Sequence, residues 1–103
     1  MIGYRYLGPA ETEAAEASLF YQQEADLGDT FLDELEERIS LLRRLPLSGT
    51  PIGSRIRKLT LTRFPYSIIY YVHQDKIVIA AVAHHRRKPN YWSDRLNDPS
   101  HPM

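Results

Sequence analysis

Two adjacent segments, Ser67–Val72 and Lys76–Ala83, limit what this chain can fold into more than any other feature of its sequence. Almost every residue in them is β-branched, aromatic or alanine, and only residues 73–75 separate them. This composition is typical of strands that are buried on both faces, and the short connection favours a hairpin. The two segments predict the centre of a β-sheet, and we expect the residues before Arg55 to pack against it.

A cluster of basic residues follows the second of these strands directly. The chain reads His-His-Arg-Arg-Lys at residues 84–88, after which Pro89 ends the strand and Tyr91 and Trp92 follow. A buried strand gives such a cluster a rigid support, and functional sites are commonly built on rigid elements. The end of this strand is therefore the predicted location of the functional site.

The residues before the sheet predict one short strand and two helices. Alternation between glycines favours a strand at Tyr4–Leu7. Gly8 and Pro9 then open a helix, Pro9–Ala25, because proline fits the first helical turn. Apolar residues at helical spacing predict a second helix, Asp29–Leu45. Since about three residues join the helices, they should form an antiparallel hairpin.

The remaining segments complete an α+β prediction. Residues 47–54 are rich in glycine and proline, residues 55–63 are strand-like, and Phe64-Pro65-Tyr66 interrupts the pattern. We predict an antiparallel sheet that carries the N-terminal helical hairpin on one face, as a single domain over residues 1–96 with a frayed tail at 97–103. The expected core consists of Leu32, Leu35, Ile39, Leu42, Ile69, Val72, Ile77, Ile79 and Val82.

The charge of the chain is zero overall but unevenly distributed. Residues 1–54 hold 10 acidic and 4 basic residues, whereas residues 55–103 hold 3 acidic and 9 basic residues. This asymmetry suggests an anionic partner for the sheet half, although two solvated surfaces that balance each other explain it equally well. The absence of cysteine favours a cytoplasmic protein, and no apolar run approaches the roughly 18 residues of a membrane-spanning helix.

The order of these elements and several motifs resemble the RelE/ParE superfamily of bacterial toxins. The matching residues in the second helix are Leu32 to Pro46, with Glu34-Leu35-Glu36. Those in the sheet and beyond it are Phe64-Pro65-Tyr66, Ile69-Tyr70, Val72, Asp75, Ile77, Ile79, Ala81-Val82, His84, Arg86-Arg87, Pro89, Tyr91-Trp92 and Arg95.

This resemblance implies a toxin that inhibits growth until a cognate antitoxin binds it, in a toxin–antitoxin hetero-oligomer. It also implies one of two targets. Some members of the superfamily cleave mRNA in the ribosomal A site, and others bind DNA gyrase and trap it on DNA. A third alternative is an inactive module that keeps only the antitoxin contacts. No cofactor or metal is expected, because no carboxylate spacing supports a metal site near the histidines.

Cleavage of RNA without a metal needs a base, an acid and positive charge at the phosphate. If the chain is a ribonuclease, the predicted catalytic residues are Arg86, Lys58 and His84. The residues expected to contact the target or the antitoxin are Arg55, Arg57, Arg63, His85, Arg87, Tyr91 and Trp92. Most of these also have structural explanations: the histidines as hydrogen-bonding residues, Arg86 and Arg87 as partners of acidic side chains, and Trp92 as a lid over the sheet.

Two observations favour gyrase over mRNA as the target. Ribonucleases of the superfamily tend to have an arginine directly after the tyrosine that starts the central hairpin, and here Ser67 follows Tyr66. A chain without net positive charge also gains little general attraction to ribosomal RNA. We further expect an apolar groove near the sheet edge and residues 86–92, where an antitoxin segment would bind.

Overall fold

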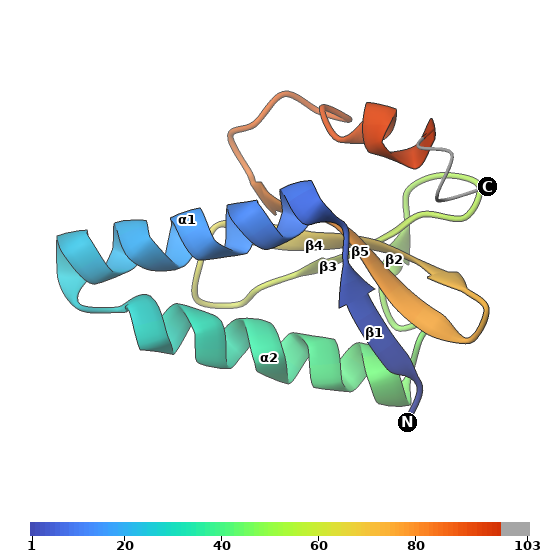
Figure 1. The fold of residues 1–103 in the computed structure, drawn as a ribbon, viewed down its shortest axis with the longest axis horizontal. Helices are drawn as coiled ribbons and strands as arrows, with labels where there is room; N and C mark the ends of the chain where they lie inside the picture. The colour runs from blue at the N-terminus through green and yellow to red at the C-terminus, as the bar shows by residue number, and fades with distance from the viewer. Residues whose placement is uncertain (98–103) are drawn as a thin grey trace.

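A five-stranded sheet with two helices on one face forms the body of the molecule (Figure 1). The computed structural model describes residues 1–97. Its elements, in chain order, are β1 (Gly3–Tyr6), α1 (Gly8–Ala25), α2 (Gly28–Arg44), β2 (Thr50–Pro51), β3 (Arg57–Thr60), β4 (Tyr66–His73), β5 (Lys76–His84) and the 3-10 helix η1 (Ser93–Asn97). The predicted α+β class is confirmed, while the predicted frayed tail lies outside the described residues except for Asn97, which ends η1.

The central hairpin is β4–β5, as the sequence predicted. The two strands pair antiparallel from Tyr66 opposite His84 to His73 opposite Lys76. Gln74 and Asp75 form the turn with φ angles of 50° and 59°, the left-handed backbone that matches the twist of a two-residue hairpin. This pairing brings the residues that follow β5 beside the start of β4.

The sheet is mixed, which differs from the antiparallel sheet that we expected. The strand order is β1-β5-β4-β3-β2, and β1 runs parallel to β5. A parallel pair needs a long connection, and in the sequence the helical hairpin and the strands β2 to β4 come between β1 and β5. The structure also adds the two-residue strand β2, which pairs antiparallel with β3 inside the predicted loop 47–54.

The helical hairpin packs closely because the contacting residues are small. Ala10, Ala14 and Ala17 of α1 are buried. A Cβ atom on Gly28 would lie 2.9 Å from the carbonyl oxygen of Ser18, so only glycine fits where α2 begins beside α1. Both helices begin and end within one residue of the predicted positions.

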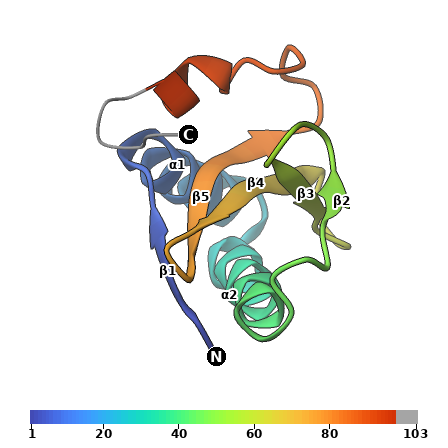
Figure 2. The same ribbon diagram turned by 90° about the vertical axis from the view of Figure 1, so that its right-hand side faces the viewer.

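The core lies in two layers, one on each face of the sheet. Seven of the nine predicted core residues are buried, while Leu32 and Val72 are only partly buried at the border of the helix-side layer. The second layer contains Leu7, Ile69, Tyr71 and Val78, and it is covered by the segment after β5, where Trp92 is 8% exposed. Figure 2 shows this segment on the far side of the sheet from α2. Trp92 therefore covers the face of the sheet that lies away from α2, which agrees with the structural explanation given for it above.

Within residues 1–97, neither helix is long and apolar enough to cross a membrane.

Candidate functional site

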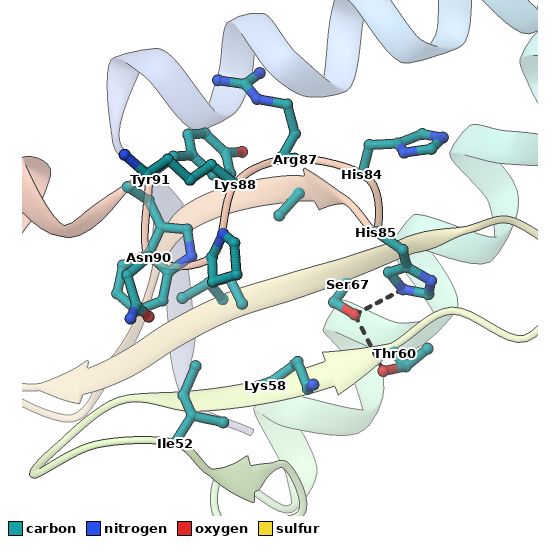
Figure 3. A pocket seen from close by; sticks show the side chains of 14 residues that line it. Ile52, Lys58, Thr60, Ser67, His84, His85, Arg87, Lys88, Asn90 and Tyr91 are labelled. Atoms are coloured by element: carbon teal, nitrogen blue, oxygen red, sulfur yellow. Dashed lines mark hydrogen bonds between the residues drawn. The ribbon is translucent and has the colours of Figure 1, made fainter.

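A cleft of about 400 Å³ lies between the sheet and the segment that follows β5 (Figure 3). We call it the basic cleft, because no carboxylate lines it. Its basic and histidine residues are Lys58, His84, His85, Arg87 and Lys88. Its apolar surface comes mainly from Ile52, Ile69, Ala83, Pro89 and Trp92. The cleft lies where the sequence predicted an apolar groove, with basic side chains added to the apolar ones.

Three side chains form a hydrogen-bonded row in the basic cleft. Ser67 Oγ lies 3.0 Å from Thr60 Oγ1 and 3.0 Å from His85 Nε2 (Figure 3). Thr60 and Ser67 face each other because β3 and β4 pair at these residues. His85 is brought to Ser67 because its backbone N–H extends the sheet pairing to Pro65 O, at 2.8 Å. The sequence alone could not have predicted this contact, because the pairing of β4 with β5 shifts by one residue between Ile69 and Tyr70.

His84 is in a different environment from His85. Its ring is turned away from Ser67 (Figure 3) and lies edge-on to the ring of Tyr66, with 5.0 Å between the centroids. Its Nδ1 atom accepts a hydrogen bond from the backbone N–H of Arg86. Burial lowers the pKa of His84, and the positive charge of Arg86 and the nearby His85 lower it further. The lowered pKa and the occupied Nδ1 both favour the neutral form of His84.

Tyr91 is held by two arginines and a carboxylate. The Arg87 guanidinium lies 3.9 Å from the centre of the Tyr91 ring, and that of Arg95 lies 5.2 Å from it. The Tyr91 hydroxyl donates a hydrogen bond to Glu13. Burial raises the pKa of Tyr91, and the hydrogen bond to Glu13 and its negative charge raise it further. The phenol thus stays protonated, and the cation contacts leave its ring less available for stacking on a nucleic-acid base.

Glu13 of α1 joins three parts of the fold. Its carboxylate accepts two hydrogen bonds from the Arg95 guanidinium, at 2.8 and 3.0 Å, and one from the backbone N–H of Val82, at 3.0 Å. Burial alone would raise the pKa of Glu13, but the hydrogen bonds from Arg95, Tyr91 and Val82 outweigh it and lower the pKa. Sequence reasoning did not identify Glu13, because 82 positions separate it from Arg95 and no local pattern links them.

A second buried carboxylate, Glu34 of α2, was also missed as a key residue. It is 2% exposed and accepts hydrogen bonds from the backbone N–H groups of Thr62 and Arg63 and from the Thr62 hydroxyl. Burial opposes the charge, but these hydrogen bonds outweigh it and lower the pKa of Glu34. Glu34 thereby fixes the turn between β3 and β4.

The structure places the predicted site residues in two groups. Lys58, His84, His85, Arg87, Tyr91 and Trp92 line the basic cleft, and Arg55, Arg57, Arg63 and Arg86 do not.

Two arginines of the second group have partners elsewhere. Arg57 donates hydrogen bonds to the carbonyl oxygens of Leu47 and Gly49, which hold the loop before β2. Arg63 forms an ion pair with Glu34, at 3.8 Å. Arg55 and Arg86 are exposed. Within residues 1–97, no three histidine, aspartate or glutamate side chains lie close enough together to hold a metal ion.

Comparison with known proteins identifies the family. The family model described as ParE toxin of type II toxin–antitoxin system, parDE, matches residues 4–89. A solved chain of the chromosomal ParDE toxin–antitoxin system from P. aeruginosa superposes with a TM-score of 0.68 at 19% identity, covering 82% of this chain and 96% of that one. No curated protein matches the sequence at a significant level. The family match includes both helices and all five strands, apart from the first residue of β1, and the chain therefore belongs to the ParE toxin family of type II toxin–antitoxin systems.

Proposed function

We propose that this protein inhibits growth by binding DNA gyrase, in the cytoplasm, until its cognate antitoxin binds it. The family match over residues 4–89 is the observation that carries this proposal. The family implies the antitoxin, and the choice of gyrase is the step beyond the family. The geometry of the basic cleft supports a toxin that acts by surface contact.

The three residues that a ribonuclease would use do not meet at one point in the cleft. Arg86 does not line it, and His84 is turned away from the Ser67–His85 pair (Figure 3). Lys58 is the one remaining candidate on the sheet surface. Metal-free RNA cleavage needs base, acid and charge to converge on a single phosphate. This separation favours recognition of a protein surface over proton transfer.

The same cleft suits an antitoxin segment that is both apolar and acidic. Apolar side chains would pack on Ile69, Ala83 and Trp92, while carboxylates would pair with Lys58 and Lys88. Of the predicted contact residues, His85, Arg87, Tyr91 and Trp92 are those that line it, and we assign the contact to them first. Antitoxin bound there would block any target that uses the same residues.

Controlled expression in bacteria tests the choice of target. We expect filamentous cells and DNA damage while uptake of labelled amino acids continues during the first minutes. His84→Gln and His85→Gln should leave the inhibition largely intact, because neither ring would transfer a proton and glutamine keeps a polar side chain at the His85 contact. Immediate loss of uptake with mRNA cut only at ribosomes would identify a ribonuclease, and removal of Lys58, Arg86 or a histidine would then cost about 10²–10⁴-fold. Normal growth would indicate the inactive antitoxin-binding module.

A further inference from the structure

The segment after β5 forms one wall of the basic cleft, and its backbone makes few hydrogen bonds to the rest of the fold. After His85, the backbone N–H groups of residues 87, 91, 93 and 95 donate to carbonyl oxygens three positions earlier, which gives local turns only. Within residues 1–97, the one backbone hydrogen bond from residues 86–96 to a strand or helix outside the segment is the local bond from Arg87 N–H to His84 O at the end of β5. The position of this wall must therefore depend on its side chains.

The side-chain hydrogen bonds that anchor this wall converge on Glu13. Tyr91 Oη donates one hydrogen bond to the carboxylate, and Arg95 donates two. Arg95 also donates to Ala80 O at 2.9 Å, and Val82 N–H binds the same carboxylate. One side chain of α1 thus connects the helix, the strand β5 and the wall.

Glu13 is not itself part of the basic cleft. It lines a separate hollow of about 230 Å³ on the α1 side, which shares His84 and Arg87 with the cleft. The link to the cleft runs through Tyr91, whose ring supports the Arg87 guanidinium at 3.9 Å. The Glu13 and Arg95 side chains are 11% and 19% exposed, so water would only poorly replace either partner if it were lost.

We propose that Glu13 is a positioning residue, which acts with Arg95 to hold residues 86–92 as the wall of the basic cleft. Without the carboxylate, Arg95 and the Tyr91 hydroxyl lose their common acceptor, and Arg87 loses its fixed platform. The wall then detaches while the sheet and the helical hairpin stay folded. The consequence for growth inhibition rests on the proposed function of the cleft, whereas the positioning role does not.

Trp92, the only tryptophan of the chain, reports on the wall directly. In Glu13→Gln we expect its emission to move to longer wavelength and its quenching by acrylamide to rise, with an unchanged far-UV circular dichroism spectrum. Hydrogen exchange should increase in residues 86–97 only. Glu11→Gln, at an exposed position of the same helix, is the matched control and should leave the emission unchanged. Tyr91→Phe removes one of the hydrogen bonds and should give a smaller shift.

Two results of these measurements would overturn the positioning role. One is Trp92 emission and quenching in Glu13→Gln that equal those of the wild type. The other is exchange that rises equally across α1, β4 and β5, which would make Glu13 a general stabilising residue. If Glu13→Gln does not fold, the same two criteria apply to Tyr91→Phe.

Growth inhibition tests the link to function at matched levels of soluble protein. Glu13→Gln should weaken inhibition. The double variant Glu13→Gln/Lys88→Ala should lose less inhibition than the sum of the two single losses, because both substitutions act on the same wall. In the double variant Glu13→Gln/Lys76→Ala the two losses of inhibition should add, because Lys76 lies at the opposite end of the hairpin from the wall. Additive effects with Lys88 would reject the link. A wild-type protein without growth inhibition would reject the proposed function, and the fluorescence measurement would still decide the positioning role.

Discussion

Replacing Glu34 by glutamine should destabilise this protein more than any other single change of charge on α2. The carboxylate is 2% exposed and accepts hydrogen bonds from two backbone N–H groups and one hydroxyl. A hydrogen bond to a charged group contributes about 1.5–3 kcal/mol, and such contributions are not additive. The glutamine amide keeps one acceptor oxygen, but its NH₂ group would face hydrogen-bond donors and could not accept from them. We therefore expect Glu34→Gln to lower the free energy of unfolding by about 2–4 kcal/mol.

Urea unfolding followed by circular dichroism measures this loss. The midpoint should fall while the dependence of the free energy on urea concentration stays the same, because the same surface is exposed on unfolding. Glu37→Gln is the matched control, since Glu37 lies on the exposed face of the same helix. Its effect should stay within about 0.5 kcal/mol. A loss no larger than that for Glu34→Gln would refute the idea that this carboxylate holds the turn between β3 and β4.

The pH dependence gives an independent check on the same residue. Because folding lowers the pKa of Glu34 below its usual value of 4.5, its ionisation stabilises the folded state above that pH. The stabilisation should decrease as the pH falls from 4.5 through the folded-state pKa. The difference in stability between the wild type and Glu34→Gln should therefore shrink over that interval. A difference that stays constant from pH 7 to pH 2 would contradict the lowered pKa.

Three further predictions concern the core, a close contact and the basic cleft. Ile79→Ala removes a fully buried side chain from β5 and should cost about 2–5 kcal/mol in urea unfolding; an unchanged midpoint would mean that β5 is not central. Gly49→Ala should cost about 1–3 kcal/mol, because the new Cβ would lie 2.7 Å from the Tyr70 ring; a stability equal to that of the wild type would show that this ring moves freely. Charge reversal at Arg87 should weaken growth inhibition more than reversal at Arg86, since only Arg87 lines the cleft; equal effects would place the contact outside it.

The sequence was most informative where local chemistry decides the structure. The β-branched and aromatic run of β4 and β5 predicted the central hairpin, and a cleft lies at its basic end. The parallel pairing of β1 could not be predicted in the same way, because the strand is short and its partner lies more than 70 positions away. Strand alternation likewise cannot show whether an arginine faces a cleft or turns to a backbone carbonyl, as Arg57 does.

The contacts that shape the site depend on tertiary structure. Glu13 reads as one of several acidic residues at the start of a helix, and only folding brings it to Arg95. Ser67 was noted because ribonucleases of the superfamily tend to have an arginine at its position, but its hydrogen bond to His85 follows from the observed pairing of β4 with β5. A regular register counted from the predicted turn would have missed this contact as well, because the pairing of β4 with β5 shifts by one residue between Ile69 and Tyr70.

Supercoiling of relaxed plasmid DNA by purified gyrase tests the central claim most directly. With this protein added in stoichiometric excess, we predict that supercoiling stops and that gyrase-bound, cleaved DNA accumulates. Adding the cognate antitoxin beforehand should prevent both effects. Unimpaired supercoiling under these conditions, together with cutting of mRNA in a purified translation system, would contradict the account.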